Sequence, residues 1–101
     1  MSTNPVAKRL AEARRKAGLS QKELGIRAGI DEFSASPRIN QYEKGKHTPA
    51  YTTLVQLGKV LNMPVPYFYC EDDLLCEMIL CFSTLQRLEQ QKVLKLLNKD
   101  N

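Results

Sequence analysis

An all-α fold is predicted for this chain, because apolar residues recur at helical spacing through most of its 101 residues and helix-capping residues separate these stretches. The clearest capping signals are Ser20 and Glu23, which have the spacing of a capping box. Leu19 and Leu24 flank them as the matching hydrophobic staple. Together these residues predict a helix over 21–28.

The first helix is predicted over about 5–17. Asn4 and Pro5 are suited to its N-cap and first position, and Gly18 ends it. Its expected inward residues are Val6, Leu10, Ala13 and Ala17, and its expected solvent-facing residues are Lys8, Arg9, Arg15 and Lys16. In the second helix, Gly25 lowers helix stability by about 1 kcal/mol relative to alanine. We therefore expect Gly25 to permit the close approach of a neighbouring helix.

A third helix, also short, is predicted from Pro37 to Lys44. Ser36 is its expected N-cap, Pro37 occupies the first helical position, and Gly45 is the stop. Two short, capped helices in tandem are typical of a helix-turn-helix.

Apolar spacing predicts the remaining helices over about 52–61, 65–69, 74–82 and 86–98, with a break near Ser83 and Thr84. The aromatic residues Tyr67, Phe68 and Tyr69 stand beside two prolines at the end of the expected bundle. We interpret them as core residues, with stacking on nucleic-acid bases as the alternative.

Length and composition favour one globular domain with a modest core. Residues 1–50 contain ten Lys and Arg against five Asp and Glu, net +5, whereas residues 51–101 contain five against six, net −1. The basic half coincides with the capped helix pair, which favours a polyanionic partner over a merely solvated basic face. No signal peptide or lipidation motif is recognised, and the apolar run 74–82 is far shorter than the ~20 residues of a membrane span. A cytoplasmic protein without a membrane partner is expected.

The three cysteines, Cys70, Cys76 and Cys81, show no Cys-x-x-Cys spacing, and the one histidine, His47, lies in the other half of the chain. Buried, unreactive thiols at Cys76 and Cys81 are favoured over a metal or redox role. We therefore expect neither a metal nor a cofactor.

A series of residues extends through the first two thirds of the chain in the order Arg14, Gly18-Leu19-Ser20-Gln21, Leu24, Gly29-Ile30, Ile39, Tyr42-Glu43-Lys44-Gly45-Lys46, Pro49, Leu54, Leu61 and Phe68. With these residues, the stretch from Arg9 to about Phe68 resembles the phage repressor and Cro type of helix-turn-helix domain, the XRE-like or lambda-repressor-like family. The resemblance implies a five-helix DNA-binding bundle over 1–70 and leaves 71–101 as a C-terminal helical extension.

The resemblance also implies which side chains meet double-stranded DNA. The expected base-reading residues are Gln41, Arg38, Ser36 and Asn40, with Asn40 the second-tier candidate, and the expected phosphate contacts are Gln21, Lys22, Lys44, Lys46 and His47. A helix that enters the major groove by its N-terminal end exposes such residues, since Gln pairs well with adenine and Arg with guanine. For Lys22, Lys44 and Lys46 the alternative is an ordinary solvated face.

Arg14 and Glu43 match a pair that this family uses as an internal salt bridge, which implies a structural role for both. One departure is the segment 29–36 between the two helices, because the family usually has a turn of three or four residues there. Residues 31–34 are the expected insertion, and we expect its acidic residues to stand off the DNA and Phe33 to pack against the bundle.

The last part of the chain, over 72–98, is predicted to form a two-helix extension that makes a homodimer interface. Its expected contact residues are Leu75, Met78, Ile79, Phe82, Val93 and Leu97. Pairing would place two recognition helices at half-sites about 34 Å apart. The alternative is that these helices fold back onto their own bundle.

The function favoured by these observations is a sequence-specific transcriptional regulator that binds double-stranded DNA, as a homodimeric repressor at a palindromic operator. The alternative is a protein-interaction module, an antitoxin or adaptor that uses the Cro-like domain and the apolar C-terminal helices. An enzyme is not expected, because His47 has no nucleophile near it in sequence and the acids at 71–73 have no convergent partner.

Overall fold

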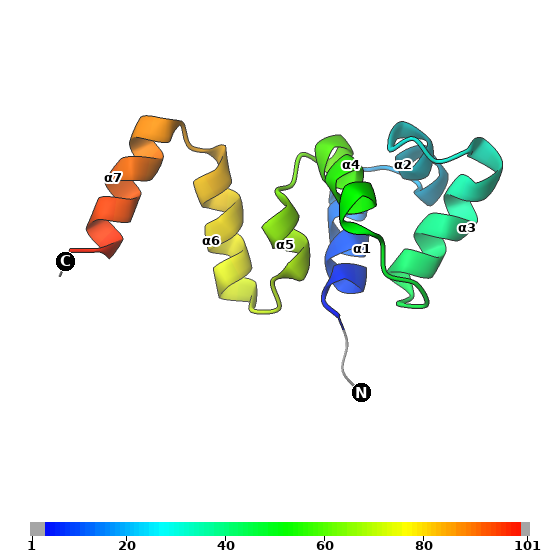
Figure 1. The fold of residues 1–101 in the computed structure, drawn as a ribbon, viewed down its shortest axis with the longest axis horizontal. Helices are drawn as coiled ribbons and strands as arrows, with labels where there is room; N and C mark the ends of the chain where they lie inside the picture. The colour runs from blue at the N-terminus through cyan, green and yellow to red at the C-terminus, as the bar shows by residue number, and fades with distance from the viewer. Residues whose placement is uncertain (1–3, 100–101) are drawn as a thin grey trace.

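The computed structural model describes residues 4–99, which form seven α-helices and no β-strand (Figure 1). In chain order they are α1 (Val6–Lys16), α2 (Gln21–Arg27), α3 (Glu32–Glu43), α4 (Tyr51–Leu61), α5 (Val65–Tyr69), α6 (Asp73–Thr84) and α7 (Arg87–Leu97). The all-α prediction is confirmed. The first five helices gather into a bundle, and α6 and α7 lead away from it toward one end of the molecule (Figure 1).

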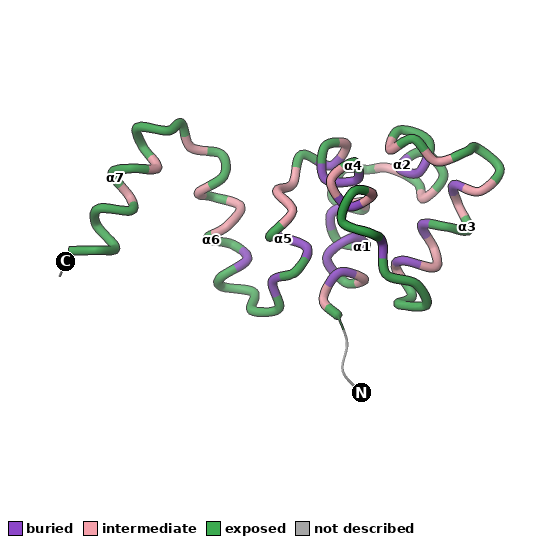
Figure 2. The backbone as a smooth tube through the Cα atoms, viewed as in Figure 1, coloured by how far each residue is buried: buried purple, intermediate pink, exposed green. Residues whose placement is uncertain are grey.

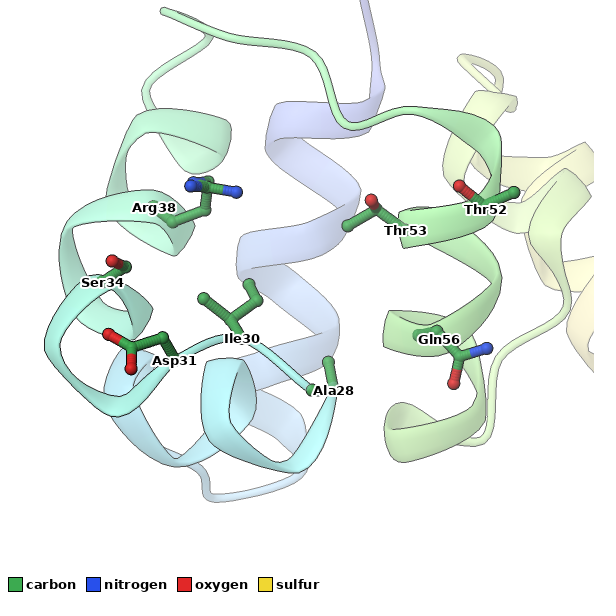
Figure 3. Close-up of a pocket in the computed structure, with 9 residues that line it drawn as sticks. Ala28, Ile30, Asp31, Ser34, Arg38, Thr52, Thr53 and Gln56 are labelled. Carbon is green, nitrogen blue, oxygen red and sulfur yellow. The ribbon is translucent and has the colours of Figure 1, made fainter.

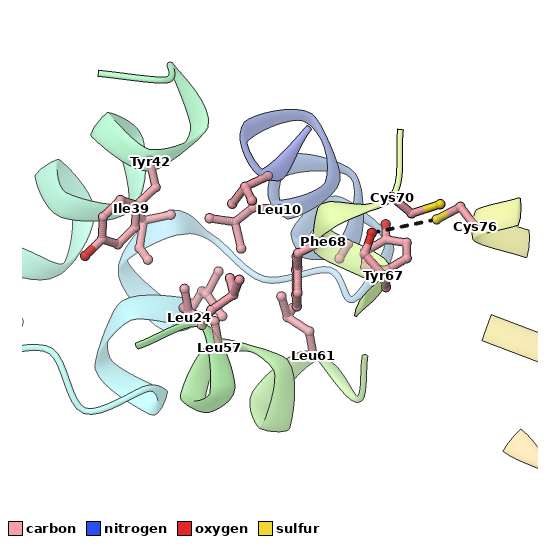
Figure 4. Packing of buried hydrophobic residues seen from close by; sticks show 13 residues of the cluster. Leu10, Leu24, Ile39, Tyr42, Leu57, Leu61, Tyr67, Phe68, Cys70 and Cys76 are labelled. Atoms are coloured by element: carbon pink, nitrogen blue, oxygen red, sulfur yellow. Dashed lines mark hydrogen bonds between the residues drawn. The ribbon is translucent and has the colours of Figure 1, made fainter. Parts of the chain in front are cut away.

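One apolar cluster joins the helices of the bundle (Figure 4). Its fully buried side chains include Leu10 from α1, Leu24 from α2, Ile39 from α3, Leu54 and Leu57 from α4 and Phe68 from α5. Each buried side chain of this size contributes about 1.5–3 kcal/mol relative to an exposed one. Because Ile39 and Tyr42 are both buried in this cluster, they fix which side of α3 faces the core.

The contact between α2 and α3 depends on Gly25. A Cβ atom at this position would lie 2.6 Å from Cβ and 2.9 Å from Cα of Ala35, which is too close for real side chains. Ala35 is itself fully buried. The expected close approach of a neighbouring helix at Gly25 is therefore confirmed, and that helix is α3.

The predicted start of α3 at Pro37 is wrong. The helix begins at Glu32, its N-cap is Asp31, and the Asp31 carboxylate accepts a hydrogen bond from the Phe33 N–H at 3.0 Å. The segment 29–36 is therefore not a lengthened loop: an ordinary turn over 28–31 is followed by one more helical turn. Pro37 lies inside the helix and cannot donate to the Phe33 carbonyl, but both residues are exposed, so water can satisfy that group.

Arg9 is also placed differently from the prediction, because its side chain is buried rather than solvent-facing. Its guanidinium donates to the carbonyl oxygens of Cys70 at 2.9 Å and Glu71 at 3.1 Å, and to the carboxylates of Asp73 at 2.9 Å and Glu12 at 3.2 Å. It also lies 5.9 Å from the centre of the Tyr67 ring. Arg9 thus ties the junction between α5 and α6 to α1.

The aromatic and thiol side chains near this junction are mostly internal. Tyr67 and Phe68 are buried, as expected, whereas Tyr69 is about half exposed. Burial raises the pKa of Tyr67 to about 12. Cys70 and Cys76 are buried side by side (Figure 4), and burial also raises the pKa of Cys76, whereas the expected burial of Cys81 is wrong because this residue is exposed.

The C-terminal helices make few contacts with the rest of the molecule. Cys76 is the one buried residue of α6, although Ile79 and Leu80 on the same helix are half-buried against the core. No residue of α7 is buried, and the Gln90 amide donates to the Phe82 carbonyl at 2.9 Å across the gap between the two helices. The helices are separated at 85–86, slightly later than predicted. In Figure 2 the tube of α7 is coloured mostly as exposed, with a few half-buried positions.

Candidate nucleic-acid interface

The outer side of α3 is polar, and the core determines which residues form it. Ala35, Ile39 and Tyr42 occupy the buried side of the helix. Among the predicted base-reading residues, Arg38 is exposed and Gln41, Asn40 and Ser36 are half-buried. Helical geometry puts Gln41 and Asn40 on the side opposite the core, whereas Arg38 and Ser36 lie on its two flanks.

A hydrogen-bonded network holds the end of α3 against α1 and α2. Arg14 Nε donates to Glu43 Oε2 at 2.6 Å and Arg14 Nη2 to Glu43 Oε1 at 3.0 Å, which is a bidentate pair. Only 14% of the Arg14 side chain and 6% of the Glu43 side chain are exposed. The Glu43 carboxylate raises the pKa of Arg14. The third guanidinium nitrogen donates to the Leu19 carbonyl at 2.9 Å, so that Arg14 also contacts the start of the helix-turn-helix.

Gln21 extends this network to the outer side of α3. Its amide nitrogen donates to Glu43 Oε1 at 3.1 Å and to Asn40 Oδ1 at 3.2 Å. Gln21 stands at the first position of α2, where the Ser20–Glu23 capping box ends the preceding loop as predicted. The side-chain oxygen of Asn40 is therefore already engaged within the protein, whereas the side chain of Gln41 makes no such bond within residues 4–99.

A polar groove of about 440 Å³ runs between α3 and α4 beside the exposed face of α3 (Figure 3). Arg38 and Ser34 line it on one side, and Thr52, Thr53 and Gln56 on the other. The three α4 residues were not singled out from the sequence. Their only signal there is a pair of threonines at the start of a helix, which is also an ordinary feature of helix N-termini.

Three predicted phosphate-contacting residues follow one another at the end of α3 and in the loop after it. Lys44, Lys46 and His47 are all exposed, as is Lys22 at the start of α2. Gly45 has a φ of +75°, which turns the chain so that the N–H groups of Lys46 and His47 reach the Gln41 carbonyl at 2.9 and 3.3 Å. This turn keeps the basic loop close to the C-terminal half of α3.

The first turn of α3 contradicts one further expectation. Phe33 does not pack against the bundle, because 84% of its surface is exposed. The reason is the helical turn that replaces the expected loop: helical periodicity puts Ala35 and Ile39 inward and leaves Phe33 on the outer side.

The predicted dimer-interface residues are not all equally available. Leu75, Met78 and Leu97 are exposed, Phe82 and Val93 are half-buried, and Ile79 packs against the core of its own chain. Of the eleven large hydrophobic residues that are exposed in the described part of the chain, seven lie on α6 and α7: Leu74, Leu75, Met78, Leu88, Leu94, Leu96 and Leu97. Apolar surface is therefore concentrated on the extension.

No helix within residues 4–99 has the length and hydropathy needed to cross a lipid bilayer. In the same range, no cluster of three or more His, Cys, Asp or Glu side chains is arranged to hold a metal ion.

Both a family model and individual relatives match this chain as a helix-turn-helix protein. Residues 10–68 match the family model described as Helix-turn-helix. The chain is 32% identical over 68 residues to the HTH-type transcriptional regulator ImmR of Bacillus subtilis (strain 168), covering 67% of this chain and 50% of ImmR. It is 33% identical over 64 residues to an uncharacterised HTH-type transcriptional regulator of Sinorhizobium medicae, covering 63% of this chain and 43% of that protein. The chain thus spans about half the length of the curated relatives that it matches.

One solved structure is similar over nearly the whole chain. The crystal structure of the transcriptional regulator BswR superposes with a TM-score of 0.84 at 44% sequence identity, and the match covers 92% of each chain. At this coverage the similarity extends beyond residue 68, where the match to the family model ends, into the C-terminal helices.

Proposed function

The chain belongs to the helix-turn-helix family of XRE-type, lambda-repressor-like transcriptional regulators, and from this premise we propose that it binds double-stranded DNA with α3 in the major groove. The observation that carries the proposal is the position of α3. Its core side is buried, its end is held by the Arg14–Glu43–Gln21 network, and its polar side is turned outward. The basic charge of residues 1–50, net +5, lies in the same part of the chain. Members of this family are DNA-binding regulators rather than enzymes.

Within this proposal the side chains of α3 have different roles. Gln41 and Arg38 are the main base-reading residues, because Gln41 is on the outer side of the helix and Arg38 is exposed at its flank. Asn40 contributes less, since its oxygen accepts from Gln21. Ser36, which is half-buried and inside the helix rather than at its cap, contacts DNA only at the edge of the groove.

The residues around α3 hold the DNA backbone. Lys22, Lys44, Lys46 and His47 are exposed near the C-terminal end of α3, since three of them follow that end and Lys22 is next to Gln21, which bonds to Asn40 and Glu43. Positive charge there meets phosphates. Gln21, which donates to Asn40 and Glu43, contacts a phosphate while it braces α3. These contacts position the protein and contribute most of its salt-dependent affinity.

We further propose that the chain acts as a homodimer through α6 and α7. Exposed apolar surface of this kind marks an interaction site, and a single reading helix contacts too few base pairs to select one genomic site. A two-fold axis through the extension pairs two copies of α3 for the half-sites of a palindromic operator. Repression is the simplest outcome, because it requires only occupancy of a promoter.

Selection of the full-length protein against random DNA duplexes tests the proposal. A palindromic consensus, with half-sites one helical turn or a multiple of it apart, is the expected result. Failure to enrich any sequence, together with no retention of DNA at low ionic strength, would refute DNA binding.

A second function, that of a protein-interaction module such as an antitoxin or adaptor, is favoured by one observation. The exposed leucines of α7 are unburied within the chain and suit a heterologous partner as well as a second copy. The two functions separate in an affinity purification from the native host. One stoichiometric heterologous protein that contacts α6 and α7 would favour the interaction module, whereas self-association alone would favour the regulator.

A further inference from the structure

The most exposed large hydrophobic residue among those described is Phe33, in the first turn of α3. Its side chain is 84% exposed and does not contribute to the core. Only its backbone N–H has a structural role, because it donates to the carboxylate of the N-cap Asp31. An aromatic ring held in water by a rigid helix has a large apolar area available to a partner. Its position on α3 indicates which partner that is.

Phe33 lies on the same side of α3 as the proposed base-reading surface. Helical geometry separates Phe33 from Pro37 by about 40° and from Gln41 by about 80° around the axis, whereas Ala35 and Ile39 are on the buried side. Pro37 is exposed as well. Phe33 and Pro37 therefore form an apolar patch that adjoins the polar side chains, at the N-terminal end of the same side of α3.

The two acids at this end do not cover the ring. Asp31 turns its carboxylate back to the Phe33 N–H at 3.0 Å. Glu32 is about 100° away around the helix, on the flank that faces α2. No carboxylate on the same side of α3 would therefore oppose the approach of the ring to the major groove of DNA.

We propose that Phe33 determines part of the sequence specificity by packing on the C5-methyl group of a thymine in the major groove. This methyl is the apolar group that a base pair presents in the major groove, and phenylalanine is one of the side chains suited to contact it. The assignment rests on the proposed function, because it requires α3 to enter the groove.

The structure also limits where the thymine lies. Phe33 and Gln41 are eight residues apart on one helix, which corresponds to about 12 Å along its axis. With about 3.4 Å between base pairs, the contacted thymine lies no more than about four base pairs from the base that Gln41 reads.

Replacement of thymine by uracil tests the assignment, because uracil lacks only this methyl group. The full-length protein is titrated with its selected operator and with duplexes that carry deoxyuridine at one thymine position per half-site at a time. Loss of one buried methyl group predicts a weakening of about three- to five-fold per contact, at one position and not at the others. The variant Phe33→Ala should bind the thymine and uracil duplexes equally at that position.

Two controls make the result specific. Phe33→Ala should keep the thermal unfolding midpoint of the native chain, because the side chain is exposed. Tyr69→Ala removes another exposed aromatic, on α5 at the other side of the bundle from α3 (Figure 1), and should keep the full response to uracil.

The outcomes separate this assignment from the proposed function. If the protein binds its operator and no uracil position weakens binding, or if Phe33→Ala responds to uracil as the native chain does, the assignment is wrong while DNA binding stands. If no duplex binds even at low ionic strength, both are wrong.

Discussion

At the scale of single residues, Glu43 fixes the orientation of α3. It accepts hydrogen bonds from Arg14 on α1 and from Gln21 on α2, so one carboxylate joins three helices. Its side chain is only 6% exposed, and removal of one partner from such a buried pair typically costs about 3–5 kcal/mol. Gln41 and Arg38 take no part in this network, whereas Asn40 on the outer side of α3 accepts a hydrogen bond from Gln21.

Replacement of Gln41 or Arg38 by alanine should therefore alter DNA recognition without altering the fold. We expect a loss of about 1–3 kcal/mol on the selected operator and a relaxed preference at one base pair. The Gln41 carbonyl, which anchors the loop after α3, is retained in the alanine variant. Equilibrium titrations of the operator and of single-base variants measure both effects.

Lys46→Ala is the matched control, since it removes a proposed phosphate contact rather than a proposed base contact. It should weaken binding to all duplexes by a similar factor and reduce the slope of log affinity against log salt by about one. If the three variants behave alike in sequence preference and salt dependence, this division between base and phosphate contacts is wrong.

The environments of Arg14 and Arg9 could not be predicted from local sequence alone, because their partners lie far away along the chain. Arg14 was assigned a structural role only through the family resemblance, and Arg9 was expected in solvent because its spacing resembles that of neighbouring basic residues. The structure buries Arg9 because carbonyl oxygens at Cys70 and Glu71 accept its N–H groups. These acceptors lie about sixty residues away along the chain, and no local pattern marks them.

At the scale of helices, the pairing of α2 with α3 determines how α3 is presented. Gly25 and Ala35 bring the two backbones together at the extra first turn of α3. The sequence revealed the glycine but not the length of its partner helix. Ser36 and Pro37 form a good helix start in isolation, and the competing Asp31 cap prevails because it lets Ala35 fill the space over Gly25.

Gly25→Ala should destabilise the protein, although alanine is the better helix former. Its methyl group would stand 2.6 Å from Ala35 Cβ, and overpacking of this kind costs about 1–3 kcal/mol. Urea unfolding measures the change. In the double variant with Ala35→Gly, part of the loss should be recovered relative to the sum of the two single variants, because the contacting methyl is gone. Strict additivity would mean that the two positions do not compete for the same space.

At the scale of the whole molecule, Arg9 connects the bundle to the extension, and we expect this connection to depend on pH. Asp73 at the start of α6 accepts from Arg9 at 2.9 Å and pairs with Lys8 at 3.6 Å. The hydrogen bond from Arg9 and the charge of Lys8 lower the pKa of Asp73. Because the folded-state pKa is lowered, the stabilisation is present above the ordinary aspartate pKa of about 3.9 and is lost as the pH falls through the lowered value.

The variant Asp73→Asn should therefore be less stable than the native chain at pH 7, and the difference should shrink as the pH falls below 4. Urea unfolding at a series of pH values measures the difference. Glu77→Gln changes another exposed carboxyl group of α6 and should differ little from the native chain at any pH. A gap between Asp73→Asn and the native chain that persists unchanged into acid would contradict this role for the carboxylate.

The proposed homodimer depends on the extension, because α6 and α7 differ from the bundle in their exposed apolar surface. The bundle buries its large apolar residues, whereas seven large apolar side chains of the extension remain in solvent in a single chain. We expect light scattering to give twice the mass of one chain at tens of micromolar.

A charge at the centre of the proposed interface, in Met78→Glu, should yield a folded monomer with weaker operator binding, because two half-sites are no longer held together. Thr84→Glu places the same charge at the end of α6, about 120° around the helix from Met78, and should remain dimeric. A native chain that is monomeric under these conditions, or a Met78→Glu variant that still dimerises, would mean that α6 does not pair two copies through this side.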